Sequence, residues 1–288
     1  SLMQRSNLRF LSKRQFWIYT LKVFICLVLV MVVLGPLLIT LFTSFKTRGH
    51  MATVSPLALP PLNEMTLENY KAVFDSKLIG FAFRNTLVIV VVSLFFNVIF
   101  GSITAYCLER FNFRFKSLII SLFLAGTMVP SFIIEITRFK VVQSLGLYNT
   151  IWASIIIYVA ADLMQLYIYR QFIRTVPVSI EESALIDGCG QFRIFWQIVF
   201  PQLAPATATV IIVKATTIIN DMYIPYLYMP KNQLKTLTTF LLSYASNQQG
   251  SWQVLSAAIV VVLIPTLLVY LFFQKYIFAG LTVGAVKE

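Results

Sequence analysis

The sequence predicts an all-α polytopic membrane protein with six transmembrane helices. Composition is the first reason, because 58% of the 288 residues are hydrophobic and only 12% are charged, whereas a soluble domain carries about 25% charged residues. The second reason is a series of six apolar runs, each close to the ~20 residues that a helix needs to cross the hydrocarbon core. Strands of a membrane β-barrel would instead be about ten residues long with alternating polarity, so helices are expected.

Each crossing is predicted from the length of its apolar run and from its low charge. Four runs contain no ionisable acid or base, the fourth in chain order contains Asp162, and the fifth contains Lys214 and Asp221. In chain order, the predicted crossings are Val23–Thr43, Thr86–Cys107, Ser117–Ile134, Ile151–Tyr169, Ala204–Ile224 and Val254–Phe273.

Orientation follows from the charges that precede the first crossing. That run is longer than the apolar core of a secretory signal, so we expect a retained anchor. Basic residues near a crossing favour the cytoplasmic side, and an even number of crossings returns the chain to the side where it began. We therefore expect both termini in the cytoplasm, with an N-terminal segment 1–22, one membrane domain 23–276 and a tail 277–288. The basic residues concerned are Arg5, Arg9, Lys13, Arg14 and Lys22.

The first outer loop, from Ser44 to Arg84, contains three prolines, at positions 56, 60 and 61. Because the residue before a proline avoids the helical region, this part is expected to be extended. A short interfacial helix should follow, capped by Thr66.

The connection from Arg170 to Leu203 is too long and too apolar to be a simple link. Ser179 and Glu182 have the spacing of a capping box, in which each side chain bonds the backbone of the other. Pro177 should stop the preceding crossing, and Gly188 should end the new helix. A second short amphipathic helix is expected at 192–199, ended by Pro201.

This loop resembles the "EAA" loop of permeases in ATP-binding-cassette importers: Glu-Ala-Ala, three residues, Gly, nine residues, Ile, one residue, Leu-Pro. Ser183 stands at the first Ala and Phe200 at the Leu. The resemblance implies that the coupling loop, residues 177–201, contains a coupling helix that docks in a groove of the ATPase subunit. The residues expected to serve this coupling are Glu182, Ser183, Ala184, Asp187, Gly188, Ile198 and Pro201. An amphipathic helix lying on lipid is the alternative, although two acids at its start would repel anionic lipid.

Further motifs resemble the carbohydrate-importer branch, in particular the maltose-permease G-type subunit. The resemblance implies import of a di- or oligosaccharide across a bacterial cell membrane, with a second, different permease, two ATPase subunits and an extracytoplasmic solute-binding protein as partners. It also implies that ATP and Mg bind the ATPases and that this chain binds no cofactor. Lys287 could contact the ATPases or lie in a solvated tail. The motifs are Arg84–Thr86, Ala105-Tyr106, Arg110-Phe111, Val129-Pro130, Leu145–Thr150 and Gly280–Lys287.

Polar groups inside crossings are costly and usually face the protein interior or a water-filled cavity. Lys214 lies near the middle of its run and needs a partner, either Asp162 or an acid of the sister permease. A structural role, as an ion pair or in interhelical hydrogen bonds, is the favoured interpretation of these polar groups, and Glu135 and Arg138 should form a local pair. The candidates for a substrate pathway are Asp162, Gln165, Lys214, Asn220, Asp221 and Tyr223.

Several function classes are disfavoured. The chain lacks a G-x-x-x-x-G-K-[ST] phosphate loop, so ATP must be hydrolysed by another chain. One histidine, His50, and three scattered cysteines assemble no zinc site and no catalytic centre. The net charge of +12 fits anionic lipid better than nucleic acid, because no basic stretch is interleaved with aromatics outside the crossings.

Two alternative transport functions remain. A secondary transporter would be expected to show inverted repeats and broken helices, and no such repeat is evident. An importer of polyols or glycerol phosphate would favour arginines in its pocket, whereas no crossing contains one.

Overall fold

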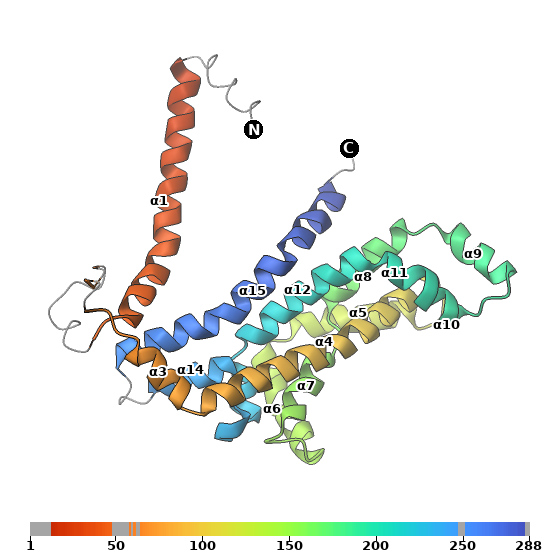
Figure 1. The fold of residues 1–288 in the computed structure, drawn as a ribbon. Helices are drawn as coiled ribbons and strands as arrows, with labels where there is room; N and C mark the ends of the chain where they lie inside the picture. The colour runs from red at the N-terminus through yellow and green to blue at the C-terminus, as the bar shows by residue number, and fades with distance from the viewer. Residues whose placement is uncertain (1–12, 48–57, 59, 62–63, 247–250, 286–288) are drawn as a thin grey trace. The chain divides into compact units, whose positions relative to one another are not determined.

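The computed structural model describes residues 13–47, 58, 60–61, 64–246 and 251–285, and every regular element within them is helical (Figure 1). The chain divides into two compact units, one formed by 1–73 with 248–261 and the other by 74–247 with 262–288. The all-α prediction is confirmed. Pro56, Lys287 and the first twelve residues lie outside the described part.

In the first unit, the long helix α1 (Lys13–Ser44) is joined to α3 (Glu68–Asp75). The Asn69 amide donates to the carbonyls of Ser44 (2.8 Å) and Lys46 (3.0 Å) at the end of α1, where carbonyl groups need partners outside the helix. Thr66 Oγ1 accepts from the Glu68 N–H at 3.1 Å, so the predicted cap of this short helix is confirmed.

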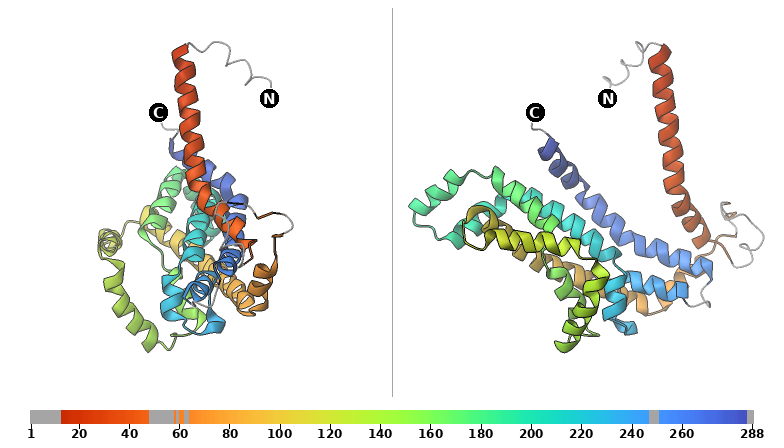
Figure 2. Two further views of the ribbon diagram at one scale, coloured as in Figure 1. Left: turned by 90° about the vertical axis from the view of Figure 1, so that its left-hand side faces the viewer. Right: turned by 180° about the vertical axis from the view of Figure 1, so that it is seen from behind.

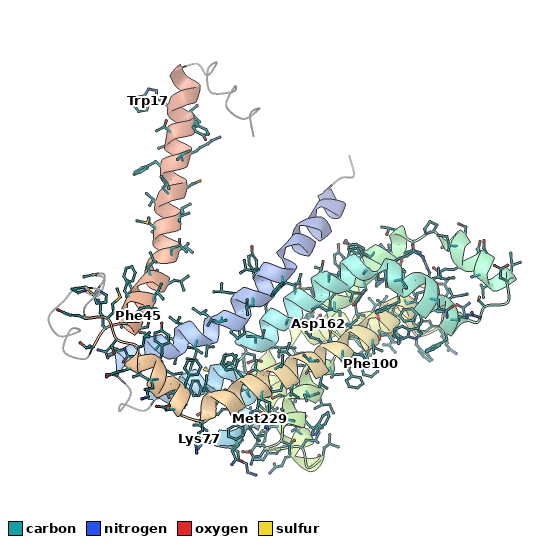
Figure 3. The ribbon with its side chains drawn as sticks, viewed as in Figure 1. Trp17, Phe45, Lys77, Phe100, Asp162 and Met229 are labelled. Carbon is teal, nitrogen blue, oxygen red and sulfur yellow. The ribbon has the colours of Figure 1, made fainter. Side chains whose placement is uncertain are left out.

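Helix α1 exposes apolar side chains on every side (Figure 3). A helix that is apolar all round is stable in lipid or in a protein interior, but not in water. Its exposure therefore fits a membrane-crossing helix whose surroundings are lipid and other subunits.

The second unit is organised around α4 (Leu78–Arg110), which packs against α7 (Ile151–Val159), α8 (Leu163–Thr175), α12 (Ala204–Asn220) and α14 (Leu237–Ser246) (Figure 2). Two buried apolar clusters lie along it. One surrounds Tyr106 and Phe195, and the other surrounds Ile89 and Tyr228.

Three helices are long and apolar enough to cross a membrane unbroken: α1, α4 and α15 (Trp252–Ala285). Three more candidate spans are bent pairs. These are α5 (Lys116–Met128) with α6 (Ser131–Ser144), α7 with α8, and α10–α11 (Gln191–Gln202) with α12; they bend by 110°, 45° and 74°. The described helices thus provide between three and six spans.

The expectation of unbroken helices at Ser117–Ile134 and Ile151–Tyr169 is therefore wrong. In the first case the cause is Pro130, because the residue before a proline is pushed out of the helical region. Val129 has ψ 123°, and α5 ends one residue before it. The predicted fifth crossing also ends early, at Asn220 instead of Ile224, where Asp221 becomes extended and a short helix, α13 (Tyr223–Tyr228), begins.

The loop between α6 and α7 contains two residues with left-handed backbone, Gly146 (φ 70°) and Asn149 (φ 61°). The Asn149 N–H donates to the Tyr228 carbonyl at 2.8 Å, and the Asn149 side chain accepts from the Lys231 N–H at 3.2 Å. The Leu145–Thr150 motif therefore fixes the loop against the chain that follows α13.

Candidate functional site

The coupling loop contains α9 (Val178–Ile186), which begins directly after Pro177. Ser179 is already inside the helix, and no side chain caps its first residue. The predicted capping box is therefore wrong, since an N-cap residue must have non-helical backbone. The Ser183 hydroxyl instead donates to the Ser179 carbonyl at 2.9 Å.

Gly188 ends α9 as predicted. Its φ of 82° is left-handed, its N–H donates to the Leu185 carbonyl (3.0 Å), and the Cys189 N–H reaches back to the Ala184 carbonyl (2.9 Å). This pair of bonds is the Schellman motif, which favours glycine at the left-handed position.

One face of α9 is buried within the chain and the other is open. Glu181 and Ala184 are buried, whereas Glu182, Ser183 and Asp187 are exposed. Large apolar side chains are also exposed on α9 and at the start of α10 (Gln191–Ile194): Ile186 is 88% and Phe192 is 75% accessible. Exposed large apolar side chains beside charged residues are typical of an interaction surface.

Glu181 attaches α9 to the end of α4. The Tyr106 hydroxyl donates to Glu181 Oε2 at 2.8 Å, and Arg110 Nε donates to Oε1 at 2.7 Å. Arg110 Nη2 also donates to the carbonyls of Ile173 (2.9 Å) and Val176 (2.6 Å), which close the end of α8. Sequence reasoning missed this cluster because it treated Glu181 only as an acid at a helix N-terminus. The i, i+4 spacing of Tyr106 and Arg110, on one face of α4, was the available signal.

A second ion-pair cluster joins α4 to α8 beside the first. Glu109 accepts from Arg170 Nε at 2.8 Å and from Arg174 Nε at 2.6 Å. Neither arginine belongs to α9, so these two ion pairs join α4 to α8 and include no residue of the coupling helix.

The second part of the coupling loop forms one nearly continuous helix: α10, a π-helical turn η3 (Phe195–Val199) and α11 (Phe200–Gln202). Pro201 was expected to end this helix but lies inside α11, which is a correction. The preceding π turn, in which the Phe200 N–H donates to the Phe195 carbonyl, reorganises the bonding ladder where the proline lacks an N–H. Ile198 is half-buried and Pro201 is exposed.

Asp162 and Lys214 meet in the second unit, as one of the two sequence interpretations of Lys214 expected. Lys214 Nζ lies 2.5 Å from Asp162 Oδ2, with 17% and 51% of the respective side chains accessible. Asp162 Oδ1 also accepts from the Gln165 N–H at 2.9 Å and thereby caps α8. The position of Asp162 is labelled in Figure 3.

Asn97 of α4 holds the break between α7 and α8. Its Nδ2 lies 3.0–3.3 Å from the carbonyls of Tyr158, Val159 and Ala160, where α7 ends. Gln165 Nε2 in turn donates to the Asn97 carbonyl at 2.9 Å. Sequence reasoning did not single out Asn97, although an amide within an apolar run is itself a signal.

The remaining candidates gather where α12 ends. Asp221 Oδ1 accepts from the N–H groups of Tyr223 (2.7 Å) and Ile224 (3.3 Å), and its Oδ2 accepts from the Tyr158 hydroxyl (2.9 Å). Asn220 bonds back to the Thr216 carbonyl, and the Tyr223 side chain is exposed. The six candidates thus form two groups, separated along α12 by about 10 Å at 1.5 Å per residue.

Asp162 borders two cavities. One, of about 380 Å³, lies against α5 and is lined by Leu122, Phe123, Gly126 and Thr127 among others. The other, of about 100 Å³, also contains Gln165, Lys214 and Thr217. Asp162 is therefore accessible from two cavities, on helices that can cross a membrane, and polar groups in such helices usually face the protein interior or a water-filled cavity.

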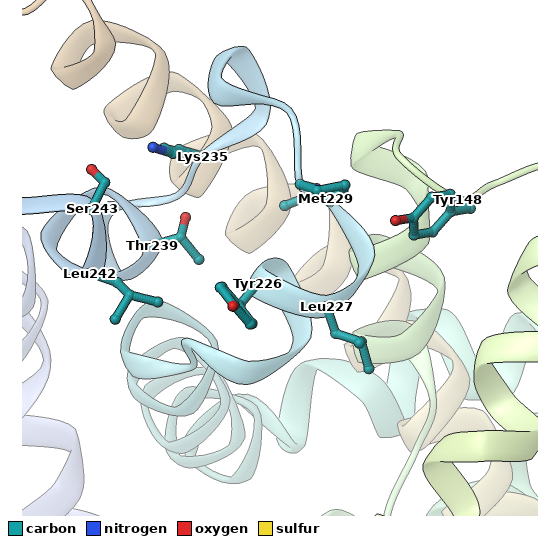
Figure 4. A pocket seen from close by; sticks show the side chains of 9 residues that line it. Tyr148, Tyr226, Leu227, Met229, Lys235, Thr239, Leu242 and Ser243 are labelled. Atoms are coloured by element: carbon teal, nitrogen blue, oxygen red, sulfur yellow. The ribbon is translucent and has the colours of Figure 1, made fainter. Parts of the chain in front are cut away.

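A larger pocket, of about 450 Å³, is drawn in Figure 4. It lies near the start of α4, opposite to the end that contacts α9, because Asn85 of α4 bonds the carbonyl of its lining residue Lys235. Figure 4 labels Tyr226, Thr239 and Leu242 among the side chains that line it. Lys235 also lines it, and burial lowers the pKa of this lysine below its usual value. This outer pocket combines aromatic rings, hydroxyl groups and one ammonium group.

Known proteins share both the sequence pattern and the fold. A probable starch degradation products transport system permease of Thermoanaerobacterium thermosulfurigenes is 29% identical over 93% of this chain and 97% of its own. A multiple sugar-binding transport system permease of Streptococcus mutans is 35% identical over 88% and 92%. The crystal structure of a bacterial ABC transporter that imports the polysaccharide alginate contains a chain with a TM-score of 0.84 and 20% identity, covering 93% of this chain and 99% of that one.

The family model of binding-protein-dependent transport system inner membrane components matches residues 97–283, which include the coupling loop, the Asp162–Lys214 pair and the outer pocket. This chain therefore belongs to that family, the membrane-embedded permease subunits of ABC transport systems.

Proposed function

We propose that this chain is one of two different permease subunits of an ATP-driven importer of di- or oligosaccharides. It forms half of the translocation path and converts ATP hydrolysis on two partner ATPases into alternating access. The observation that carries this proposal is α9: its inner face is fixed to α4 and α8, while Glu182, Asp187 and Ile186 are exposed to a partner. The sugar cargo is proposed because relatives over nearly the whole chain carry sugar transport in their names.

In this proposal, the end that contains α9 faces the cytoplasm, and both termini lie on that side. The outer end receives sugar from an extracytoplasmic solute-binding protein. ATP and Mg bind on the ATPases, and this chain binds no cofactor. The segment 1–22, the membrane domain 23–276 and the tail 277–288 keep the roles given by the sequence, although α15 continues through residue 276 to Ala285.

The coupling residues and the pathway residues have separate roles. Glu182, Ser183, Asp187 and Gly188 belong to the face or end of α9 that a partner can reach, and Ala184 packs it internally. Ile198 and Pro201 lie on the adjoining helix. Asp162, Gln165, Lys214, Asn220, Asp221 and Tyr223 border the polar path.

Reconstitution tests this function. The chain is co-expressed with its sister permease and ATPases, purified as a complex and inserted into lipid vesicles with the binding protein. We expect labelled maltotriose, raffinose or chitobiose to accumulate only with ATP and binding protein. Accumulation driven by a proton or sodium gradient without ATPase would instead support a secondary transporter. ATP-driven uptake of glycerol 3-phosphate or a polyol, with none of the sugars, would support the other cargo.

A further inference from the structure

The inner end of α4 is a buried electrostatic junction. Both carboxylate oxygens of Glu181 are occupied, one by Tyr106 and one by Arg110, and the Glu181 and Arg110 side chains are only 9% and 13% accessible. Glu181 therefore cannot serve an ATPase without breaking its bonds within this chain. Removing one partner of a buried ion pair leaves an uncompensated charge, so the junction resists separation.

The outer end of α4 carries a second junction. Asn85 is fully buried, and its Nδ2 donates to the carbonyls of Gln233 (2.8 Å) and Lys235 (3.0 Å). The next residue, Thr86, accepts from the Leu237 N–H at 3.0 Å. These bonds fix the segment 233–237, and Lys235 of that segment lines the outer pocket.

Helix α4 joins the two junctions without interruption. It contains no proline. Kinks also occur at glycine–serine pairs, and α4 has one, Gly101-Ser102, but this pair is buried within unbroken helix and Gly101 packs against Gln165 of α8. Asn85 and Tyr106 are separated by about 30 Å along the helix at 1.5 Å per residue, which is close to the thickness of the hydrocarbon core. One stiff element therefore connects the coupling helix to a wall of the outer pocket.

We infer that Glu181, Arg110 and Tyr106 are positioning residues for coupling, and that α4 transmits movement of α9 to the 233–237 wall of the outer pocket. The inference rests on the proposed function, since it requires an ATPase that moves α9. Helix α4 is hydrogen-bonded to α9 at one end and to the 233–237 segment at the other. Because the helix is rigid, a displacement of α9 must also displace this segment.

The first experiment compares Glu181→Gln with Glu109→Gln in the reconstituted complex. Both changes neutralise one glutamate at the same end of α4, but only the first loosens α9. For Glu181→Gln we expect sugar imported per ATP hydrolysed to fall by about tenfold, within the range typical of coupling energies, while ATP hydrolysis and subunit composition stay near those of the parent. Glu109→Gln should retain the parent ratio. An equal fall in both variants would overturn the inference.

The second experiment measures the accessibility of a cysteine placed at the outer pocket. Cys26, Cys107 and Cys189 are replaced by serine or alanine, and Tyr226→Cys is introduced, because Tyr226 is 61% accessible at the pocket. Reaction with a membrane-impermeant maleimide is measured without nucleotide and in the vanadate-trapped state. We expect the rate to differ between the two states in the parent background and to become equal when Glu181→Gln is added. A nucleotide-dependent difference that survives Glu181→Gln would contradict the inference, as would the absence of any difference in the parent.

If the Glu181→Gln variant fails to assemble, Tyr106→Phe tests the same junction. It removes one hydrogen bond and retains the ring, so a smaller loss of the same ratio is expected, and an unchanged ratio would count against the junction. Failure of the parent complex to import sugar with ATP would refute the proposed function. Import by the parent, with coupling unaffected by the junction variants, would refute only the inference.

Discussion

At the scale of single residues, Gly101 and Gln165 show how closely α4 and α8 approach. A Cβ atom at position 101 would lie 2.1 Å from Gln165 Nε2 and 2.4 Å from its Cδ. Gln165 is buried and is held by its bond to the Asn97 carbonyl. The glycine is thus required by the neighbouring side chain and not by an unusual backbone angle.

Gly101→Ala should therefore destabilise the protein by about 1–3 kcal/mol, the usual cost of overpacking a core. Thermal unfolding of the detergent-solubilised complex measures this loss. Gly126→Ala is the matched control, because a Cβ there meets nothing within 4 Å. Adding Gln165→Ala should recover part of the loss, and a double variant no more stable than the sum of the single changes would contradict the steric explanation.

Glu182 differs from its neighbour Glu181 because it is exposed. Glu182→Gln should weaken ATPase association by roughly 1–3 kcal/mol, typical of one charge-assisted hydrogen bond. Co-purification of the ATPase over a range of salt concentrations measures this, with Glu68→Gln as control because Glu68 is an exposed glutamate of α3, outside the coupling loop. ATPase recovery equal to that of the parent would remove Glu182 from the interface.

At the scale of elements, the break between α7 and α8 depends on a side chain from a third helix. Carbonyl groups at a helix end need partners, and Asn97 supplies them for Tyr158, Val159 and Ala160. Within the membrane, water is not available as a substitute. The bend of 45° is therefore stabilised from α4 and is not a property of the α7–α8 sequence alone.

Asn97→Leu keeps a similar volume and removes the donor, so we expect a loss of about 1–3 kcal/mol from unsatisfied carbonyls. The midpoint of thermal unfolding and the ATP-driven uptake rate should both fall. Asn220→Leu is the matched control for the unfolding midpoint, since the Asn220 amide bonds to the Thr216 carbonyl one turn back along its own helix. An equal shift in the two variants would refute a special role for Asn97.

The sequence predicts continuous elements better than broken ones. Uninterrupted apolar runs predicted the positions of α1, α4 and α15, because hydropathy and length are enough to identify a continuous membrane-crossing helix. Pro130 and Asp162 were visible in the sequence, but their effect depends on what surrounds them: Pro130 lies inside an apolar run, and Asp162 caps α8 while pairing with Lys214.

Local sequence patterns predicted the C-terminal end of α9 correctly and its N-terminal end incorrectly. The prediction that Gly188 ends the helix was correct, because the left-handed backbone at a helix C-terminus is a local requirement that glycine meets. The capping box was wrong because Pro177 starts the helix earlier, and Glu181 was undervalued because its partners lie more than seventy positions earlier in the chain.

At the scale of the whole molecule, the Asp162–Lys214 pair bears on the path through the membrane. Its position beside two cavities fits a wall of that path, and its short contact equally fits a structural tie between α8 and α12. Breaking such a pair by removing one charge is costly, whereas removing both is often nearly neutral.

Asp162→Asn and Lys214→Met should each lower the midpoint of thermal unfolding, and the double variant should recover most of it. Uptake kinetics then distinguish a role in the sugar pathway from a purely structural role. A pathway role predicts that the sugar concentration for half-maximal uptake stays raised in the stable double variant, whereas parent-like kinetics would assign the pair to structure alone.

The accessible apolar side chains of Ile186 and Phe192 also bear on how the chain is produced. In the proposed complex, a copy inserted without its ATPases would leave this apolar surface exposed on the cytoplasmic side, and such surfaces drive aggregation. Surplus subunits would then be prime targets for membrane quality-control proteases. The proposed assembly therefore requires synthesis of the permease to keep step with that of the ATPases.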